Sequence, residues 1–174
     1  VICRGAPRMK TNACRLLDAL QIRYETREYA VDPEDLSGET VAKKINMPVE
    51  QVFKTLLCRV DQKDIVFAVL SVADELDFKK LSSAVGGRRA ELVPIKEVQP
   101  LTGYIRGGVT VFASKKPYPA FADESIELFD VISVSAGTRG MQILLNPTDY
   151  LRASEATVVD LTRPPAPDAE SGSL

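Results

Sequence analysis

The chain has 174 residues, of which 45% are hydrophobic, and its formal net charge at pH 7 is -2. This length fits one domain with a substantial core, and the slightly acidic balance argues against a broad nucleic-acid-binding face, which is usually basic. The sequence contains no histidine, which excludes the commonest general base, the commonest metal ligand and every Ser–His or Cys–His pair.

No stretch of the sequence approaches the roughly 20 apolar residues of a membrane-spanning helix, and no leader with a cleavage site is recognised. We therefore expect a soluble, cytoplasmic protein. The three cysteines, Cys3, Cys14 and Cys58, are odd in number and far apart, so the sequence predicts no disulfide framework and no zinc site. We expect neither a metal nor a cofactor.

Both ends of the chain are expected to lie outside the folded domain. Residues 1–8 carry no pattern and are interpreted as an extension or a cloning remnant. Residues 164–174 are rich in proline, serine and acidic side chains, which is typical of a disordered tail. The predicted domain therefore spans residues 9–163.

Two helices and a strand are predicted in the first quarter of the domain. Thr11 or Asn12 can cap the first helix, and Ser37 can cap the second after a loop. Residues 24–29 combine tyrosines and a threonine with charges, as a half-exposed edge strand does. The apolar residues that share a face of each helix are Ala13, Leu16, Leu17 and Leu20, and Val41, Ala42 and Ile45.

Lys54 is a charged residue in a segment, residues 51–60, whose pattern otherwise predicts a buried strand, and its position therefore needs an explanation. Residues 65–72 are almost unbroken apolar sequence and are its expected antiparallel neighbour. The pair predicts the floor of a sheet that is covered on both faces. A lysine at the rim of such a sheet either reaches water or serves as a fixed positive charge in a pocket, and spacing alone favours the first interpretation.

The rest of the chain alternates short helices and strands. Asp77 can cap a helix that ends at Gly86-Gly87, Pro94 opens one further helical turn, and Pro147 starts a short helix. This alternation, with its hairpin signals, predicts an α+β domain around a mixed, curved sheet. The expected strands are residues 90–93, 131–134, 141–145 and 156–161, of which the second and third form a hairpin.

Two glycine-bearing segments stand out, residues 103–108 and 135–140. Three glycines within six residues, Gly103, Gly107 and Gly108, imply positive φ angles or close approach by another group. The structural interpretation is a tight bend before a strand. The functional interpretation is that the bare backbone offers its N–H groups to a ligand carbonyl or phosphate.

These glycine segments, the Val52-Phe53-Lys54-Thr55-Leu56 stretch and the Met9-Lys10-Thr11 start resemble the YbaK/EbsC family over roughly residues 9 to 163. The family comprises free-standing relatives of the prolyl-tRNA synthetase editing domain. The resemblance implies a barrel-like mixed sheet flanked by helices and an aminoacyl-tRNA deacylase that acts in trans. Its typical substrate would be tRNA(Pro) mischarged with cysteine or, in some subgroups, alanine.

The resemblance also implies a site. Lys54 matches the family's signature pocket lysine, and it is expected to act with the backbone N–H groups around Gly107 and Gly108. The expected substrate-binding residues are Tyr29, Thr55, Gly103, Ser135, Gly137, Arg139 and Gln142.

Two positions depart from the family's pattern. The family often has a proline where this chain has Val111, and its cysteine-specific bacterial members commonly have an acid where this chain has Gln142. The second departure bears on the preference for cysteine. An aminoacyl ester is already activated, so a histidine-free site can cleave it by placement and charge, with the thiol of a cysteinyl substrate as the attacking group.

The implied partners are the acceptor end of tRNA(Pro) and, as a further candidate, prolyl-tRNA synthetase. An acidic protein of this size would grip only the tRNA end, since few phosphate contacts give weak, salt-sensitive binding. The candidate tRNA contacts are Lys43, Lys44, Lys79, Lys80, Arg88 and Arg89.

Two other functions stay open at this stage. The chain could keep the pocket but only bind a tRNA end, a nucleotide or a synthetase. It could also use Cys58 as a nucleophile, although no histidine is present to activate a strand-buried thiol.

Overall fold

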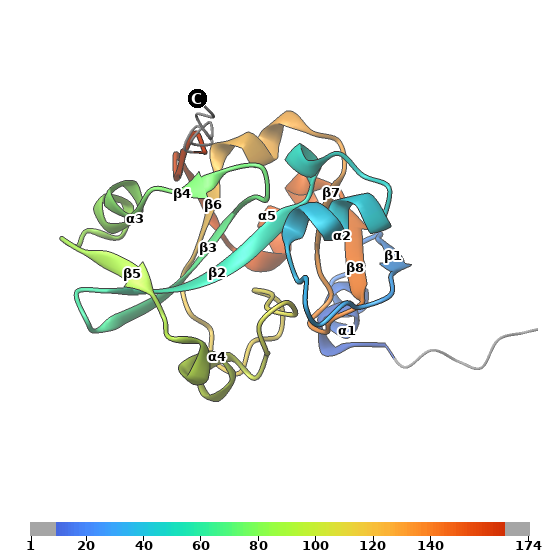
Figure 1. Ribbon diagram of the computed structural model, residues 1–174, viewed down its shortest axis with the longest axis horizontal. Coiled ribbons are helices and arrows are strands. Elements are labelled where there is room, and N and C mark those ends of the chain that lie inside the picture. The colour runs from blue at the N-terminus through green and yellow to red at the C-terminus, as the bar shows by residue number, and fades with distance from the viewer. Residues whose placement is uncertain (1–9, 166–174) are drawn as a thin grey trace, which may run out of the picture.

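The computed structural model describes residues 10–165, so the predicted extension at residues 1–8, the start at Met9 and nearly all of the predicted tail lie outside the described residues (Figure 1). The helices are α1 (Asn12–Ala19), α2 (Gly38–Lys44), α3 (Phe78–Val85), α4 (Ile95–Thr102) and α5 (Pro147–Ser154), with 3₁₀ helices at Val49–Gln51 and Glu124–Leu128. The strands are β1 (Glu25–Glu28), β2 (Phe53–Val60), β3 (Asp64–Ser71), β4 (Glu75–Leu76), β5 (Ala90–Leu92), β6 (Ala120–Asp123), β7 (Ile132–Ser135), β8 (Met141–Leu145), β9 (Thr157–Val159) and β10 (Thr162–Arg163). No helix within residues 10–165 is long and apolar enough to cross a membrane.

The largest sheet is mixed and has the order β5-β2-β3-β6-β9. The strands β2 and β3 form the predicted antiparallel hairpin, whereas β6 and β9 run parallel to β3. The sequence did not predict β6, because the strand is short, follows Pro117 and Pro119 closely, and pairs only with distant segments. The predicted α+β class is confirmed.

A second sheet has the order β1-β8-β7 and contains the predicted hairpin of β7 and β8. Its β1 lies at the edge and is mostly exposed, as predicted. The start of β2 meets this sheet through a parallel bridge between Val52 and Ser133. The two sheets therefore come together beside the first residues of β2, the strand that contains Lys54 (Figure 1). A third, two-stranded sheet pairs β4 with β10.

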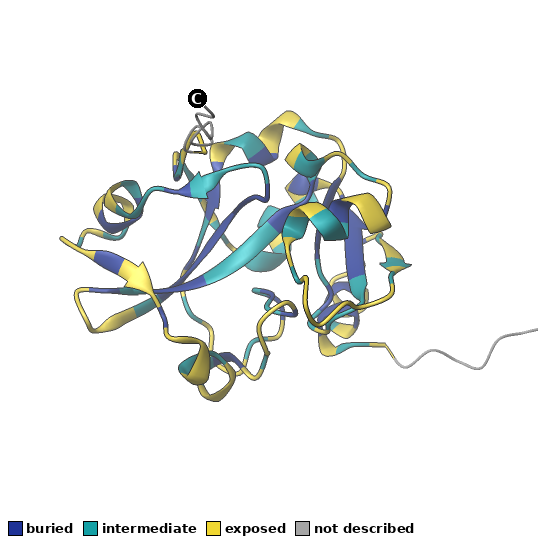
Figure 2. Cartoon of the chain, viewed as in Figure 1, coloured by how far each residue is buried: buried dark blue, intermediate teal, exposed yellow. Residues whose placement is uncertain are grey.

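Strand β3 is buried on both faces, as predicted (Figure 2). One face packs against Leu81 of α3 and Leu161, and Phe67 on the other face contacts the Tyr118 ring edge to face. Strand β2 is less covered, because Lys54 to Leu56 are only partly buried. The prediction of full cover is therefore right for β3 and wrong for the first half of β2.

The predicted helix signals are mostly confirmed. The side chains of Thr11, Ser37 and Asp77 accept hydrogen bonds from backbone N–H groups at the starts of α1, α2 and α3, and Gly86 ends α3 in the left-handed conformation. Helix α4 is longer than the predicted single turn, since it continues through Pro100. Residues 109–111 do not form the strand that the structural interpretation of the first glycine segment implied.

Candidate active site

A cavity of about 440 Å³ lies along the first half of β2. The N-terminal part of α2, the Arg106–Val109 loop and the β5–α4 connection form its other walls. The lining residues are Leu36, Gly38, Val41, Val52, Phe53, Lys54, Thr55, Leu56, Leu57, Val72, Leu92, Val93, Ile95, Val98, Arg106, Gly107, Val109, Ser135 and Gln142. A cavity of this size can enclose a small aminoacyl ester together with part of a nucleoside.

Lys54 is half-buried in the wall of this cavity and does not extend into bulk solvent. Its Nζ donates a hydrogen bond of 2.8 Å to the backbone carbonyl of Asp74, in the turn after β3. Burial lowers the pKa of the Lys54 ammonium below its ordinary value, and the negative charges of Glu39, Asp74 and Glu75 partly oppose this effect. An ammonium group has three donors, so this contact leaves two for a ligand.

Five of the predicted site residues share the cavity, namely Lys54, Thr55, Gly107, Ser135 and Gln142. The Ser135 Oγ accepts a hydrogen bond of 3.2 Å from the Gly137 N–H. The Gln142 side chain is buried, and its Oε1 accepts a hydrogen bond of 3.0 Å from the Ser133 hydroxyl. The polar groups from β7 and β8 are therefore held in place before a substrate arrives.

The adjacent glycines Gly107 and Gly108 have different roles. Gly107 lines the cavity and has a φ of +86°, which side-chain-bearing residues rarely adopt. The Gly108 N–H donates to the Ile105 carbonyl at 2.9 Å, and a Cβ at this position would lie 3.1 Å from the Thr138 carbonyl carbon. The group that closely approaches Gly108 is thus the residue 135–140 turn, which leaves Gly107 as the one of the two that faces the cavity.

The other predicted residues lie outside the cavity. Gly103 is the left-handed C-cap of α4, Gly137 packs against the Tyr104 ring, and the Arg139 Nε donates to the Arg106 carbonyl at 2.8 Å. Tyr29 lines a much smaller depression, which shares Leu36, Val41 and Gly107 with the cavity. Arg139 and Gly137 therefore support the cavity wall, while Tyr29 lies behind it.

Comparison with known proteins identifies the family. Residues 33–153 match the family model described as an aminoacyl-tRNA editing domain. The chain belongs to the YbaK/EbsC family of aminoacyl-tRNA editing domains. The matched residues lie within the predicted domain at residues 9–163, whose limits stay a prediction.

Two relatives of this editing domain carry names that specify a substrate. EbsC of Enterococcus faecalis, named as a Cys-tRNA(Pro)/Cys-tRNA(Cys) deacylase, is 36% identical over 88% of this chain and 93% of its own length. ProXp-y of Escherichia coli K12, named as a multifunctional Ser/Thr-tRNA deacylase, is 31% identical over 72% of this chain and 77% of its own length.

Solved structures agree on the fold. One described as a trans-editing enzyme for prolyl tRNA synthetase superposes with a TM-score of 0.75 at 24% identity, and covers 89% of this chain and 99% of its own. The hypothetical protein APE2540 superposes with a TM-score of 0.79 at 17% identity, over 87% of this chain and 99% of its own.

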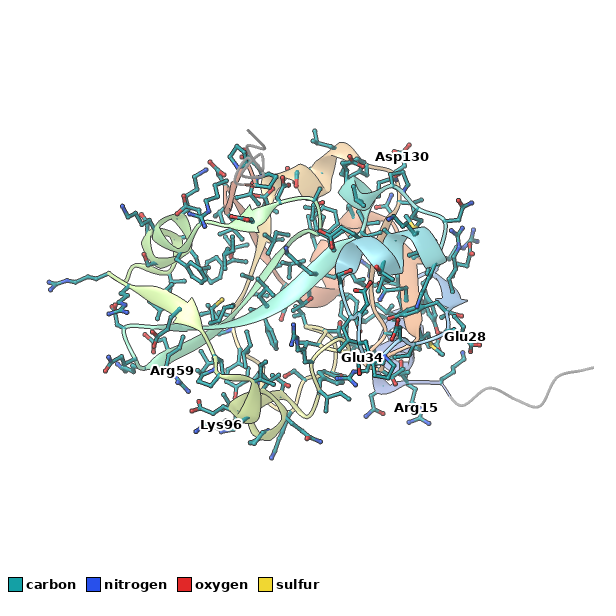
Figure 3. All side chains as sticks on the ribbon, viewed as in Figure 1. Arg15, Glu28, Glu34, Arg59, Lys96 and Asp130 are labelled. Carbon is teal, nitrogen blue, oxygen red and sulfur yellow. The ribbon has the colours of Figure 1, made fainter. Side chains whose placement is uncertain are left out.

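The editing-domain cavity also contains residues that the sequence did not single out. Arg106 is a second positive side chain in the lining, and a charged residue inside a glycine-rich segment could have signalled it. The apolar wall made by Leu92, Val93, Ile95 and Val98 carried no such signal, because apolar residues are usual in strands and helices. An ion pair between Arg59 and Glu97 ties β2 to α4. Figure 3 labels Arg59 of β2 and Lys96, the residue before Glu97 in α4.

Cys58 does not belong to the editing-domain site. Its side chain is fully buried in the core on β2 and does not line the cavity. Burial raises the pKa of the Cys58 thiol to about 12, so the thiol stays protonated near neutral pH. A buried, protonated thiol is not positioned to attack an ester in the cavity.

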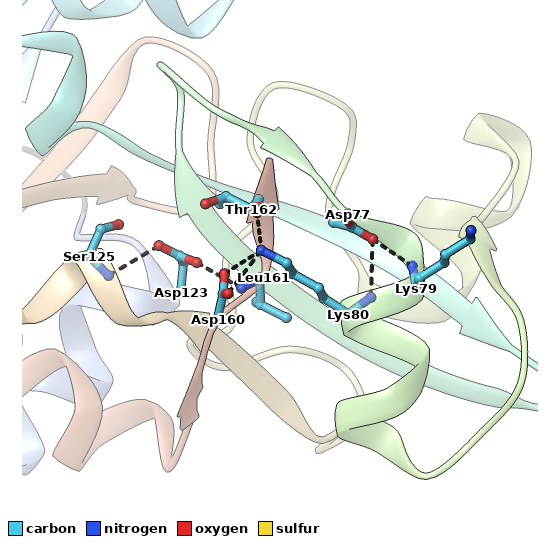
Figure 4. Close-up of polar contacts among 8 residues, drawn as sticks. All are labelled: Asp77, Lys79, Lys80, Asp123, Ser125, Asp160, Leu161 and Thr162. Carbon is cyan, nitrogen blue, oxygen red and sulfur yellow. Dashed lines mark hydrogen bonds and ion pairs between the residues drawn. The ribbon is translucent and has the colours of Figure 1, made fainter. Parts of the chain in front are cut away.

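Some of the basic residues predicted to contact tRNA already have hydrogen-bond partners within the protein. The Lys80 Nζ contacts both carboxylate oxygens of Asp160 at 2.9 Å and donates to the Thr162 carbonyl at 2.7 Å (Figure 4). The Lys44 Nζ donates to the Ala30 carbonyl at 2.7 Å. Lys80 therefore links α3 to the segment that contains Asp160 and Thr162.

Proposed function

We propose that this chain is a trans-editing deacylase that removes cysteine from mischarged tRNA(Pro). Membership of the editing-domain family makes it an aminoacyl-tRNA deacylase, an enzyme that cleaves the ester between an amino acid and the tRNA. The observation that carries the proposal is that Lys54 and Gly107 face one cavity in a chain without histidine. The name of EbsC supports cysteine, whereas that of ProXp-y specifies serine and threonine.

The cavity would act by placement and charge. Lys54 would bind and orient the ester and the terminal ribose, since two of its protons are free for a ligand. The Gly107 N–H would donate to the ester carbonyl oxygen and stabilise the negative charge that develops on it. The side chains of Thr55, Ser135 and Gln142, which line the same cavity, would position the side chain of the substrate.

The substrate itself would supply the nucleophile. The cysteine sulfur attacks the ester carbonyl carbon, the C–S bond forms and the ester C–O bond breaks, and the proton lost by the thiol ends on the ribose oxygen. The products are a cyclic thiolactone, which water opens, and free tRNA. For an alanyl ester, a water molecule oriented by the neighbouring ribose hydroxyl would take the place of the thiol.

The partner would be the acceptor end of the tRNA, with prolyl-tRNA synthetase as a candidate source of further affinity. Lys43, Lys79, Arg88 and Arg89 are the proposed phosphate contacts, although Arg89 also has an ion pair with Glu91 at 3.9 Å. Lys44 and Lys80 are less available, because their ammonium groups already donate hydrogen bonds. An enzyme with this substrate would work in the cytoplasm.

A deacylation panel tests the substrate. Purified protein is incubated with tRNA charged with cysteine, alanine, serine or threonine, and release of amino acid is compared with spontaneous hydrolysis. We expect cysteinyl-tRNA(Pro) to be cleaved fastest. Faster cleavage of seryl- or threonyl-tRNA would contradict the cysteine assignment and leave the deacylase class intact.

The role of the substrate thiol has its own test. S-methylcysteinyl-tRNA(Pro) has nearly the same shape but no attacking thiol, so we expect at least a tenfold slower cleavage. Equal rates for the two substrates would show that water, and not the thiol, attacks the ester.

A further inference from the structure

The charged side chains in the cavity leave one part of an aminoacyl ester without an obvious partner. Only Lys54 and Arg106 among the lining residues are charged, and both are positive. The substrate carries a positive α-ammonium group beside its ester. Because a buried ammonium needs hydrogen-bond acceptors, the cavity must supply oxygen atoms that are not carboxylates.

The first half of β2 offers such oxygens, because its edge is open there. On one side β2 pairs with β3 along its whole length. On the other side β5 pairs only with Cys58 to Val60, and the Val93 N–H bonds to the Leu57 carbonyl. The bridge to β7 involves Val52, so no other strand within residues 10–165 pairs with Lys54, Thr55 or Leu56 on this side.

The alternation of the ladder decides which groups face the opening. In an antiparallel pair, the N–H and C=O of one residue point to the same side, and those of the next residue point to the other. The Val52 carbonyl accepts from the Val72 N–H on the β3 side, and the Leu57 carbonyl accepts from Val93 on the opposite side. Lys54 and Leu56 are therefore bonded to β3, whereas the N–H and C=O of Thr55 are directed to the open side.

The cavity lies against this open edge. Six consecutive residues, Val52 to Leu57, line it, although alternate side chains of a strand point to opposite faces. We infer that backbone atoms at the edge contribute to the lining, because a strand edge exposes the backbone of every residue along it. Figure 2 shows this part of β2 as partly buried, beside a β3 that is buried from Val66 to Ser71.

We propose that the aminoacyl group binds to Thr55 as a single residue of an antiparallel strand. This inference rests on the proposed deacylase function and specifies how its substrate is held. The α-ammonium donates to the Thr55 carbonyl, and the Thr55 N–H donates to the ester carbonyl oxygen. An amino acid ester has one nitrogen and one carbonyl in the same relation as a residue in a strand, so the two bonds form together.

The arrangement has a consequence for the reaction. The Thr55 N–H becomes a second donor to the carbonyl oxygen, beside the Gly107 N–H. It also places the α-amine without a carboxylate, which fits a lining that contains the uncharged Gln142 and, among the described residues, no acidic residue. The side-chain oxygens are less suited to this task, because Ser135 Oγ and Gln142 Oε1 already accept hydrogen bonds.

A pair of stable analogues tests the proposal without any need for cleavage. One is 3′-amino-3′-deoxyadenosine joined through an amide to cysteine, and the other carries 3-mercaptolactic acid, in which a hydroxyl replaces the α-amine. Binding is measured by titration at pH 6, where the amine is charged. We expect the amine analogue to bind at least tenfold more tightly, and to shift the Thr55 backbone amide in ¹⁵N-resolved NMR spectra.

Three variants distinguish the strand edge from the nearby side chains. Thr55→Val, Ser135→Ala and Gln142→Leu each remove one side-chain acceptor and leave the Thr55 backbone in place. The tenfold preference for the amine analogue is expected to persist in all three. A preference below twofold in the wild-type protein, or its loss in any one variant, would overturn the proposal, whereas failure to cleave cysteinyl-tRNA would refute only the proposed function.

Discussion

The contact between Gly38 and Val72 sets the position of α2 at the mouth of the cavity, and a single methyl group should disturb it. Gly38 is the first residue of α2, Val72 follows β3, and both line the cavity. A Cβ built on Gly38 would lie 2.2 Å from Val72 Cγ1 and 2.6 Å from Val72 Cβ. The backbone of Gly38 does not have a positive φ, so alanine there introduces a clash without backbone strain.

The expected magnitude follows from opposing effects. Overpacking of this kind costs about 1–3 kcal/mol, while alanine favours a helix over glycine by up to about 1 kcal/mol. We expect Gly38→Ala to reduce the free energy of unfolding by about 1–2 kcal/mol, which corresponds to roughly 2–8 °C in Tm for a chain of this size. Deacylation should also slow, because α2 must shift away from the cavity.

A double-mutant cycle makes the reasoning testable. Val72→Ala alone should cost about 2 kcal/mol through lost burial and a cavity. In the double variant the nearest clashing atom, Val72 Cγ1, is absent, but the Cβ of residue 72 remains 2.6 Å from the added methyl group, so the clash is relieved only in part. The combined loss should therefore be smaller than the sum of the single losses. Strict additivity in chemical denaturation would refute this account of α2. Gly86→Ala is the matched control, because Gly86 has a φ of +85° and no heavy atom within 4 Å of an added Cβ, so Val72→Ala should not rescue it.

Three further predictions concern charge and reactivity. Because burial lowers the pKa of Lys54, the deacylation rate should fall as the pH rises through that lowered pKa, at a lower pH than for an ordinary lysine. A Lys54→Arg variant should not show this fall in its pH–rate profile. An identical fall in both proteins would show that a group of the substrate, and not Lys54, titrates. The Cys58 thiol is buried and its pKa is raised to about 12, so iodoacetamide at pH 8 should not modify it in the folded protein. Mass spectrometry should find Cys58 modified only after unfolding. Rapid labelling of the folded protein would contradict the assignment of Cys58 to the core. Lys80→Glu should lower the Tm by breaking the contacts with Asp160 and Thr162. Lys79→Glu should leave the Tm within about 1 °C of the wild-type value and weaken only tRNA turnover. An unchanged Tm for Lys80→Glu would show that the Lys80–Asp160 ion pair does not contribute to stability.

Local signals in the sequence were sufficient for most of the fold. The caps at Ser37 and Asp77 and the β2–β3 hairpin depend on residues close together in the chain, so their patterns are visible in the sequence. Strand β6 was missed because its pairing with β3 joins segments about 50 residues apart and its own residues carry a weak strand pattern. Pairing with a distant strand, and not propensity, makes it a strand.

The site was predictable only in part, and for a similar reason. Family resemblance selected Lys54, Thr55, Ser135 and Gln142, and the structure brings these together with Gly107 from distant parts of the chain. The family resemblance could not distinguish glycines that face the cavity from glycines that allow two loops to approach each other closely. Gly108 belongs to the second kind, because its neighbour is the backbone of Thr138. The open edge of β2 could not be seen in the sequence, since it arises where β5 ends and β7 begins.

Single-turnover deacylation of cysteinyl-tRNA(Pro) by the wild-type protein, Lys54→Ala and Lys63→Ala tests the central claim most directly. Lys63 is exposed in the turn between β2 and β3 and does not line the cavity, so it controls for the loss of one positive charge. The account predicts that Lys54→Ala slows cleavage at least 100-fold, in the range seen when one stabilising donor is lost, while Lys63→Ala stays within twofold of the wild-type protein. A wild-type rate no faster than that of Lys54→Ala would contradict the account and favour a module that binds the tRNA end without cleaving the ester.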